Sequence, residues 1–218
     1  MRGGIRLALL RHGPTAWNAA RRLQGRTDVK LSPEGRTAVA RWRLPEQAGL
    51  DWRDDGWISS PLARCRETAE FMLRSMGRNM DGASLVLDDR LIERSFGDWE
   101  GETLAGLRAR YGADMAAWEA KGWDFRPPGG ESPRDVLQRS MPLLQEMLQQ
   151  ERSMICVTHR SVIRAIYAAA RGWDMVGRPP EKLADGAVHL FRLSDAGLAV
   201  DRLNLALVDP PIDEAGAA

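Results

Sequence analysis

The chain has 218 residues, of which 44% are hydrophobic and 28% charged, a composition that argues against a fibrous or largely disordered protein. Lysine and arginine number 31 against 30 acidic residues, so the net charge of +1 gives no overall attraction to nucleic acid or to an anionic membrane. The longest apolar runs are far shorter than the roughly 18 residues that a membrane-spanning helix needs. We therefore expect a globular protein without nucleic-acid or membrane partners, in which any anion-binding site is local.

Two further features bear on the compartment of the protein. An arginine at position 11 follows the short N-terminal apolar run at once and leaves no room for the apolar region of a signal peptide, so we expect a cytoplasmic location. The two cysteines, Cys65 and Cys156, have neither a metal-type spacing nor the pattern of a disulfide scaffold. We expect both to be buried thiols.

The elements predicted for the first half of the chain alternate between strand and helix. Short apolar runs predict the strands, and apolar residues at helical spacing predict the helices. A serine, a proline and a glutamate at 32–34 supply an N-cap, a first-turn proline and an early acid, which together mark a helix start. In chain order we expect a strand at 5–10, a helix at 34–44, a strand at 57–60, a helix at 61–76 and a short strand at 84–87.

The middle of the chain interrupts this alternation. Residues 92–102 mix glycine, acids and aromatics and are expected to form a loop. A helical segment begins near Thr103, breaks at Gly112 and resumes to Ala120 before a turn-rich stretch. We expect the segment 99–131 to form a helical cap over one edge of the sheet.

The alternation resumes at Ser132, where a cap, a first-turn proline and a third-position acid start another helix. Residues 153–158 then form an apolar, β-rich run, and Gly172 is placed to close the next helix. In chain order we expect a helix to about 150, a strand at 153–158, a helix at 162–171, and a hairpin of strands at 188–193 and 198–203.

Strands that alternate with helices predict a mostly parallel central sheet with helices on both faces. The expected fold class is therefore α/β: a three-layer sandwich with an antiparallel edge hairpin and a helical cap segment. We expect a single domain over 1–209, with 99–131 as its cap, and a disordered tail at 210–218. In such folds ligands bind beyond the carboxyl ends of the strands.

Side chains with useful chemistry stand at or just beyond three of the predicted strands. They are Arg11 with His12 after the first strand, Arg64 after the second, and His159 after the strand at 153–158. A histidine at a strand end is by itself more often a structural residue than a catalyst. The sequence around each of them therefore decides the interpretation.

Five ordered blocks of sequence resemble the histidine phosphatase superfamily, which is also called the phosphoglycerate mutase-like family. The Arg-His-Gly tripeptide alone would be weak evidence, but blocks in the same order across nearly the whole chain are strong evidence. The blocks are LLRHGPTAWN at 9–18 (with Gln24-Gly25 and LSPEG at 31–35 behind it), SSPLARCRETA at 59–69, IERSFGDWEG at 92–101, PPGGES at 127–132 and VTHRSVIRA at 157–165.

The resemblance implies phosphoryl transfer through a phosphohistidine at His12. It implies that Arg11, Arg64 and His159 hold the phosphoryl oxygens and that Glu93 is the proton donor. Thr15, Asn18 and Gln24 are secondary candidates for binding the phosphate of the substrate. The implied substrate is a small-molecule phosphate ester, and no cofactor is implied.

Elementary chemistry agrees with this assignment. Arginine binds phosphate in a planar, bidentate way and stays charged, so Arg11 and Arg64 can take the place of a metal clamp, and no metal is expected. His12 must attack as neutral imidazole, with its second nitrogen donating to a backbone carbonyl. A protonated His159 would add a further positive charge. Read singly, Arg64 and Glu93 also suit a structural role in ion pairs with neighbouring charged residues.

The sequence departs from the family at Arg160, because the second histidine is commonly followed by glycine. We expect Arg160 to bind substrate and to tune substrate choice if it faces the mouth of the pocket. Trp17 and Trp99 are candidates for lining that pocket, and the turn at 129–132 is a possible contact to substrate. His189 lies in the middle of a predicted strand and is interpreted as structural.

Three functions remain open, and metal-independent phosphomonoester hydrolysis is the leading one. Phosphoglycerate mutase activity is the alternative, but the lysine-containing motif that grips a carboxylate in the mutases is missing between Lys30 and Lys121. A non-catalytic binding module on the same fold is the remoter alternative. A metal hydrolase is disfavoured because no HExxH or other close histidine pair exists. The sequence does not predict an oligomeric state, and its blocks are similar to those of the α-ribazole phosphatase and broad-specificity branch.

Overall fold

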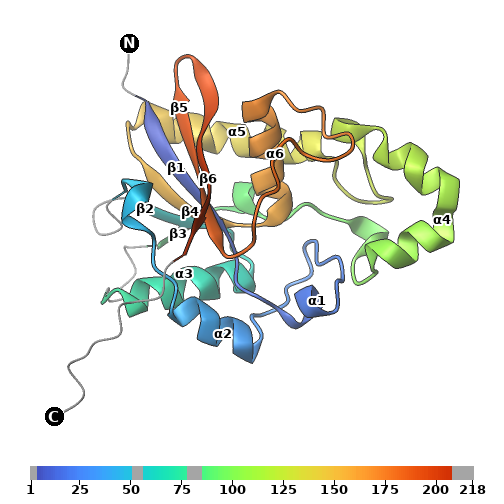
Figure 1. Cartoon of the computed structure of the whole chain (residues 1–218), viewed down its shortest axis with the longest axis horizontal. Coiled ribbons are helices and arrows are strands. Elements are labelled where there is room, and N and C mark those ends of the chain that lie inside the picture. The colour runs from blue at the N-terminus through green and yellow to red at the C-terminus, as the bar shows by residue number, and fades with distance from the viewer. Residues whose placement is uncertain (1–3, 51–55, 78–84, 208–218) are drawn as a thin grey trace.

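Six strands of the described residues form one central sheet (Figure 1). The computed structural model describes residues 4–50, 56–77 and 85–207. The strands are β1 (Ile5–Arg11), β2 (Gly56–Ser59), β3 (Leu85–Leu87), β4 (Met154–Thr158), β5 (Ala187–Ser194) and β6 (Gly197–Ala206), in the order β3-β2-β4-β1-β5-β6. β3, β2, β4 and β1 run parallel, and β5 and β6 are antiparallel at the far edge. The mostly parallel sheet and the antiparallel edge hairpin are thus confirmed.

Helices cover both faces of this sheet, α5 (Pro133–Gln149) and α6 (Arg160–Arg171) one face and α2 (Pro33–Ala40) and α3 (Ala63–Ser75) the other (Figure 1). The alternation of side chains along β1 accounts for the two cores. Leu7 and Leu9 pack in the cluster that includes α5 and α6, whereas Ala8 and Leu10 pack in the cluster that includes α2 and α3. All four side chains are buried. The three-layer α/β sandwich is therefore confirmed.

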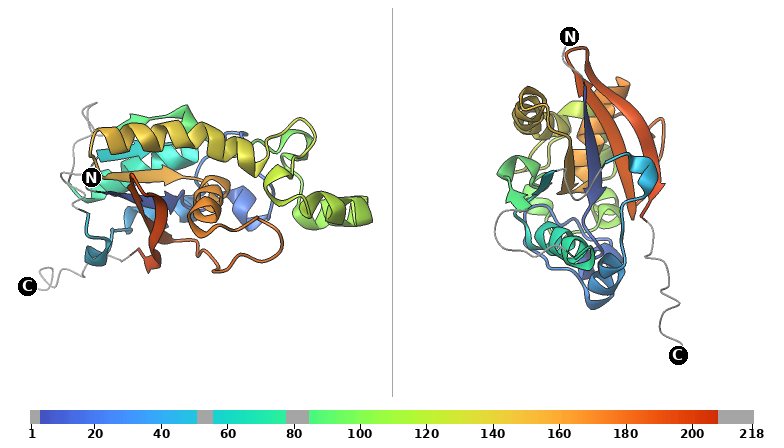
Figure 2. Two further views of the ribbon diagram at one scale, coloured as in Figure 1. Left: turned by 90° about the horizontal axis from the view of Figure 1, so that it is seen from above. Right: turned by 90° about the vertical axis from the view of Figure 1, so that its left-hand side faces the viewer.

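The segment between β3 and α5 extends away from the sheet and carries its own small core. Its main helix, α4 (Leu104–Glu119), lies farthest from the sheet in Figures 1 and 2. Gly112 interrupts this helix with φ 49° and ψ −118°, a left-handed conformation that favours glycine, so the expected break is confirmed. Three buried side chains form the core, with four aromatic residues packed against it: Trp99, Leu107 and Met115, and Phe96, Tyr111, Trp118 and Phe125.

Most expected helix ends lie within a residue or two of the observed ends. Ser132 caps α5 with a reciprocal capping box, and Gly172 closes α6 in the left-handed conformation. The helix expected at 34–44 ends at Ala40 instead. Arg43 explains the early end, because its guanidinium donates to the carbonyls of Ala40 and Trp42 and ties the turn to α3.

Several other expectations concern smaller features. Cys65 and Cys156 are both buried and free, as predicted. A 3₁₀ turn at Gly97–Trp99 lies within the segment 92–102 that was expected to be a loop, and a short helix, α1 (Ala16–Ala19), precedes the first helix predicted from the sequence. No helix of the described residues has the length and apolar character needed to cross a bilayer. The predicted tail at 210–218 and residue 84 of the third predicted strand lie outside the described residues.

Candidate active site

The carboxyl ends of β1 and β4 bring the two histidines of the predicted site together. Arg11 pairs in register with Thr158, and the backbone N–H of His12 donates to the carbonyl of Thr158 at 3.0 Å. His12 and His159 are the next residues on the two strands, and their ring centroids are 5.3 Å apart. The parallel register of the sheet thus places both side chains at one edge.

His12 is buried, with only 5% of the residue exposed. Its Nδ1 lies 2.7 Å from the carbonyl oxygen of Gly13, so this nitrogen carries the proton and donates. The lone pair is left on Nε2. Burial lowers the pKa of His12 well below its usual value, and the charges of Arg11 and Arg64 lower it further. The imidazole is therefore neutral near pH 7. Its second nitrogen donates to a backbone carbonyl, as predicted, and the structure identifies that carbonyl as Gly13.

Arg64 is fully buried in the first turn of α3, and its guanidinium is held on three sides. Nη2 donates to the carbonyl of Gly25 at 2.7 Å and Nη1 to that of Thr27 at 2.9 Å, while Nε donates to Nδ1 of His159 at 3.3 Å. Of the five N–H groups of an arginine, about two remain for another acceptor. The interpretation of Arg64 as a surface ion pair is wrong, because the neighbouring Glu67 pairs with Arg36 instead.

The same contact determines the tautomer of His159, which is fully buried. Because Nδ1 accepts from Arg64, the proton resides on Nε2, which lies 2.8 Å from Oγ of Ser60 and 3.3 Å from Sγ of Cys65. Burial lowers the pKa of His159 well below its usual value, and Arg64 and His12 lower it further. The buried ring is therefore neutral and lies against an arginine, so His159 does not supply the further positive charge that its protonated form would add.

Asp185 joins the two arginines nearest the histidines. Arg11 Nη1 donates to Asp185 Oδ1 at 2.7 Å, and Arg160 Nη2 donates to Asp185 Oδ2 at 2.5 Å. Burial alone would raise the pKa of Asp185, but the two arginines hold it below its usual value. Within the described residues, the Nε of Arg11 is buried without a hydrogen-bond partner. Asp185 was not predicted from the sequence, although it precedes β5, which is antiparallel to β1, and therefore stands at the carboxyl edge of β1.

Glu93 is buried beside this centre, with 7% of the residue exposed. One of its oxygens accepts the backbone N–H of Arg94 at 2.8 Å, and the hydroxyl of Thr158 donates to the carbonyl of Leu91 and so ties the segment to β4. The charge of Glu93 acts on Arg64 and opposes the effect of burial on the pKa of that arginine. A surface pair with Arg90 is not formed, because Arg90 pairs with two other carboxylates.

The three secondary candidates fall into two groups. Thr15 and Asn18 form a reciprocal cap on α1, in which each side chain bonds the backbone of the other. Gln24 is buried, and its Oε1 has no hydrogen-bond partner among the described residues. The residue after it, Gly25, accepts from Arg64, whereas the hydrogen bonds shown for Thr15 and Asn18 are within the cap.

A cavity of about 550 Å³ is formed partly by residues that stand next to the predicted site residues in the chain. Its lining includes Arg94 and Arg160, which directly follow Glu93 and His159 in the chain. The remaining lining residues come mostly from the segment 99–131, from α6 and from the loop after α6. Its apolar wall is made by residues that include Phe96, Trp99 and Phe125, and its arginines are Arg94, Arg108, Arg160, Arg164 and Arg178.

The cavity bears on several predictions. Trp99 lines it as expected, and Arg160 faces it, whereas Trp17 is not among its lining residues. The turn at 129–132 packs against 95–98 through backbone contacts. The sequence analysis missed Arg164, although it lies four residues after Arg160 and so shares a helix face with it.

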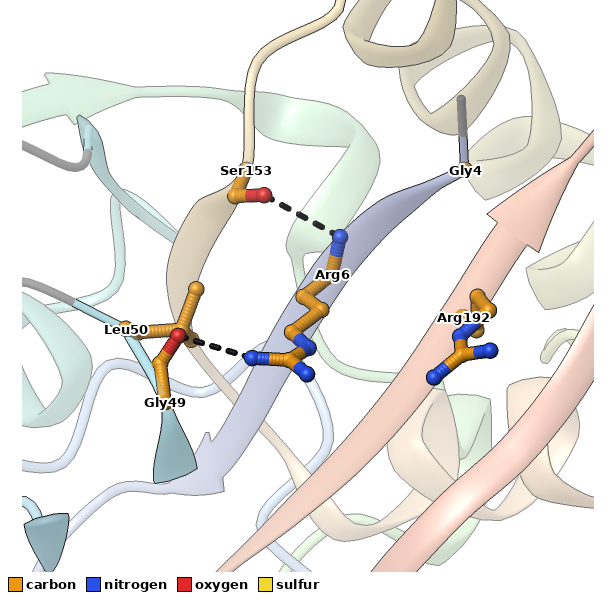
Figure 3. A pocket seen from close by; sticks show the side chains of 6 residues that line it. All are labelled: Gly4, Arg6, Gly49, Leu50, Ser153 and Arg192. Carbon is orange, nitrogen blue, oxygen red and sulfur yellow. Dashed lines mark hydrogen bonds between the residues drawn. The ribbon is translucent and has the colours of Figure 1, made fainter. Parts of the chain in front are cut away.

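His189 and a second hollow lie outside this centre. His189 is buried in the hairpin, where its Nδ1 accepts the backbone N–H of Asn204, as a structural residue would. Figure 3 shows the second hollow, of about 410 Å³, where Arg6 donates to Gly49 and to the hydroxyl of Ser153. It lies at the amino ends of β1 and β4, the edge opposite to the histidines.

Comparison with known proteins connects this geometry to a family. The model of the histidine phosphatase superfamily (branch 1) matches residues 7–206. A 2,3-bisphosphoglycerate-dependent phosphoglycerate mutase of Azorhizobium caulinodans is 31% identical over 203 residues, covering 90% of this chain and 96% of the mutase. A glucosyl-3-phosphoglycerate phosphatase of Mycolicibacterium vanbaalenii is 34% identical over 189 residues, covering 79% of each chain.

Solved structures agree with these relatives. A mycobacterial glucosyl-3-phosphoglycerate phosphatase in complex with VO3 superposes with a TM-score of 0.72 at 29% identity, covering 93% of this chain and 100% of the other. A putative α-ribazole-5'-P phosphatase from Escherichia coli, at 21% identity and a TM-score of 0.71, shares the fold. With the family model matched over 7–206 and relatives that cover most of the chain, this protein is an enzyme of the histidine phosphatase superfamily, branch 1.

Proposed function

We propose that this enzyme hydrolyses small-molecule phosphomonoesters through a phosphohistidine on Nε2 of His12. One observation carries the proposal: His12 is buried and neutral, with its Nδ1 proton bonded to Gly13, which leaves the Nε2 lone pair as the nucleophile. In the first step the Nε2–phosphorus bond forms and the ester P–O bond breaks. In the second step water attacks phosphorus, the N–P bond breaks, and inorganic phosphate leaves.

The charges around His12 suit the transition state of this transfer. Phosphoryl transfer needs an in-line nucleophile and positive charge on the equatorial oxygens more than it needs covalent chemistry from the protein. Arg64, with about two N–H groups unengaged, and Arg11 supply this charge from fixed positions. His159 holds Arg64 in place through Nδ1, and its direct contact with the phosphoryl group stays a prediction.

The two arginines also make a metal clamp unnecessary, so we propose catalysis without metal or cofactor. In the described parts of the chain, no three histidine, cysteine or acidic side chains are grouped so that they could hold a metal ion.

Glu93 is proposed to move the protons of both steps. Its carboxyl group protonates the departing ester oxygen in the first step, and the resulting carboxylate takes a proton from the attacking water in the second. Its burial beside Arg64, with one oxygen bonded to the Arg94 backbone, favours this role over a surface ion pair. Gln24, Thr15 and Asn18 are proposed as additional contacts to the phosphate.

The cavity that Arg94 and Arg160 line is proposed as the place of the leaving group. Its size of about 550 Å³ and its wall from the segment 99–131 support a cap that selects the leaving group within a single domain over 1–209. Relatives that act on glucosyl-3-phosphoglycerate make phosphorylated glycerate derivatives reasonable first substrates to test.

The test of the chemistry is rapid quenching with ³²P-labelled phosphomonoester. We expect an acid-labile, alkali-stable phosphoprotein in the wild type and none in His12→Ala. Labelling or normal turnover in His12→Ala would refute the assignment of the nucleophile.

Mutase activity is the second candidate, because of the 31% identity with a phosphoglycerate mutase. In that case the phosphoenzyme passes its phosphoryl group to a phosphoglycerate rather than to water. Incubation with 3-phosphoglycerate and 2,3-bisphosphoglycerate separates the two, since hydrolysis predicts release of inorganic phosphate and the mutase predicts 2-phosphoglycerate.

A further inference from the structure

The cavity of about 550 Å³ contains a buried arginine, Arg94, that has no counterion among the described residues. Arg94 is 8% exposed, and among the described residues no carboxylate is hydrogen-bonded or ion-paired to its guanidinium. Its Nε has no hydrogen-bond partner at all. The guanidinium instead lies over the rings of Phe96 and Phe125, at 4.5 Å and 5.3 Å from their centroids. Aromatic faces offset only part of the cost of burying a charge.

Arg164, which also lines the cavity, is half-buried. Its Nε is buried without a hydrogen-bond partner among the described residues, and its guanidinium lies 5.2 Å from the centroid of the Trp173 ring. Within the described part of the chain it too has no acidic partner in a salt bridge. Two other arginines of the same cavity differ, because Arg108 pairs with Glu119 at 2.8 Å and Arg160 pairs with Asp185.

The unpaired arginines also repel one another. The pKa of Arg94 is lowered to about 10, mainly by burial and in lesser part by the charge of Arg164, while Glu93 and Glu131 act in the opposite direction. Burial lowers the pKa of Arg164 as well, with Arg160 as the second cause. Neither of the two carboxylates that raise the pKa of Arg94 bonds its guanidinium. Glu93 accepts from the backbone N–H of Arg94, and Glu131 pairs with Arg26 and Arg139. An oxyanion placed between two such arginines relieves both the burial and the repulsion.

We propose that Arg94 and Arg164 bind a second oxyanion, a carboxylate or a phosphate, carried by the leaving group of the substrate. This proposal rests on the proposed function, in which the first phosphate lies at His12. The substrate is then a small phosphomonoester with two separated negative groups, joined by a body that the aromatic wall of Phe96 and Phe125 contacts. Arg160 is expected to contribute less than Arg94 and Arg164, because it already pairs with the carboxylate of Asp185, which it shares with Arg11.

The test compares the binding of non-hydrolysable phosphonates by titration calorimetry. Benzylphosphonate carries one anionic group, its 3-carboxy and 4-carboxy derivatives add a carboxylate, and its 4-phosphonomethyl derivative adds a phosphonate. A charge-assisted hydrogen bond predicts that at least one of the doubly anionic ligands binds the wild type about tenfold more tightly or better than benzylphosphonate. The derivative that binds best identifies which oxyanion the site prefers.

Three variants show whether Arg164 causes that preference. Arg164→Gln should abolish most of it, and Arg164→Lys, which keeps the charge, should restore part of it. Arg108→Gln is the matched control, because it removes a charge from the same cavity that Glu119 already neutralises, and it should leave the preference within about twofold. Equal binding of all four phosphonates to the wild type, or a preference that survives Arg164→Gln, would overturn the proposal.

The binding assay separates this proposal from the proposed function. Calorimetry with phosphonates needs no turnover, so a preference that depends on Arg164 supports the second anion site even in an enzyme that fails the phosphohistidine test. Hydrolysis of simple monoesters together with an absent preference would instead support the chemistry at His12 and reject the site at Arg94 and Arg164.

Discussion

The buried, neutral state of His12 predicts that the enzyme loses stability as the pH falls below 6.5. The pKa of His12 in the folded protein lies well below the value of about 6.5 expected for an unfolded chain. Below pH 6.5 the unfolded chain therefore binds a proton that the folded protein excludes, and the free energy of unfolding falls with pH. Between pH 6.5 and 5.0 one such histidine costs at most about 1.6 kcal/mol of stability.

The variant His12→Asn removes this titrating group. Asparagine keeps a side-chain N–H for the carbonyl of Gly13 but does not titrate, so the stability of the variant relative to the wild type should rise by up to about 1.6 kcal/mol from pH 6.5 to 5.0. The measurement is urea unfolding followed by tryptophan fluorescence at both pH values. Cys156→Ala serves as a control, because burial raises the pKa of that thiol to about 12, far from this window.

Parallel pH profiles of wild type and His12→Asn would refute the reasoning. They would mean that His12 titrates in the folded enzyme much as it does in the unfolded chain. The nucleophile would then be partly protonated near neutral pH, and burial would not be what keeps its lone pair available.

Three further predictions concern groups around the centre. Arg64→Gln should lower the rate of phosphoenzyme formation by about 10²- to 10³-fold, as the loss of a hydrogen-bond donor to the transition state does. A decrease of less than tenfold in rapid-quench experiments would show that Arg64 does not bind the phosphoryl group. Glu93→Gln should slow single-turnover phosphorylation by alkyl phosphates far more than by p-nitrophenyl phosphate, whose leaving group needs no proton; equal losses would show that Glu93 is not the acid. Asp185→Asn should lower the inhibition constant of inorganic phosphate, a competitive inhibitor, by up to about fivefold, because the carboxylate no longer occupies Arg11. A higher inhibition constant would mean that Asp185 orients Arg11 for the phosphate.

The fold and the meeting of His12, His159 and Arg64 were predictable from the sequence, because both depend on local patterns. Apolar runs mark the strands, and parallel strands deliver the residues that follow them to one edge. The protonation of His159 was not predictable, since it depends on how completely the ring is buried and on the direction of one hydrogen bond from Arg64.

Asp185, Arg94 and Arg164 were missed for a related reason. The contact of Asp185 with Arg11 requires that β5 pair antiparallel with β1, a choice that the hairpin pattern alone does not make. The unpaired state of Arg94 and Arg164 depends on where the acidic side chains around them come to lie in three dimensions. A sequence so rich in both charges offers many possible partners for every arginine, and only the folded chain shows which remain unmatched.

The pairing of β1 with β4 has a consequence for how this enzyme can diversify. His12 and His159 follow residues in direct register, so their separation is a property of the spacing between neighbouring strands and hardly depends on the loops around them. A shift of one residue in that register would turn every β1 side chain to the opposite face and exchange the two cores. Lengthening, shortening or replacing α4 leaves the register untouched. Insertions in that segment can therefore reshape the cavity over many generations of variants while the distance between the two imidazoles stays the same.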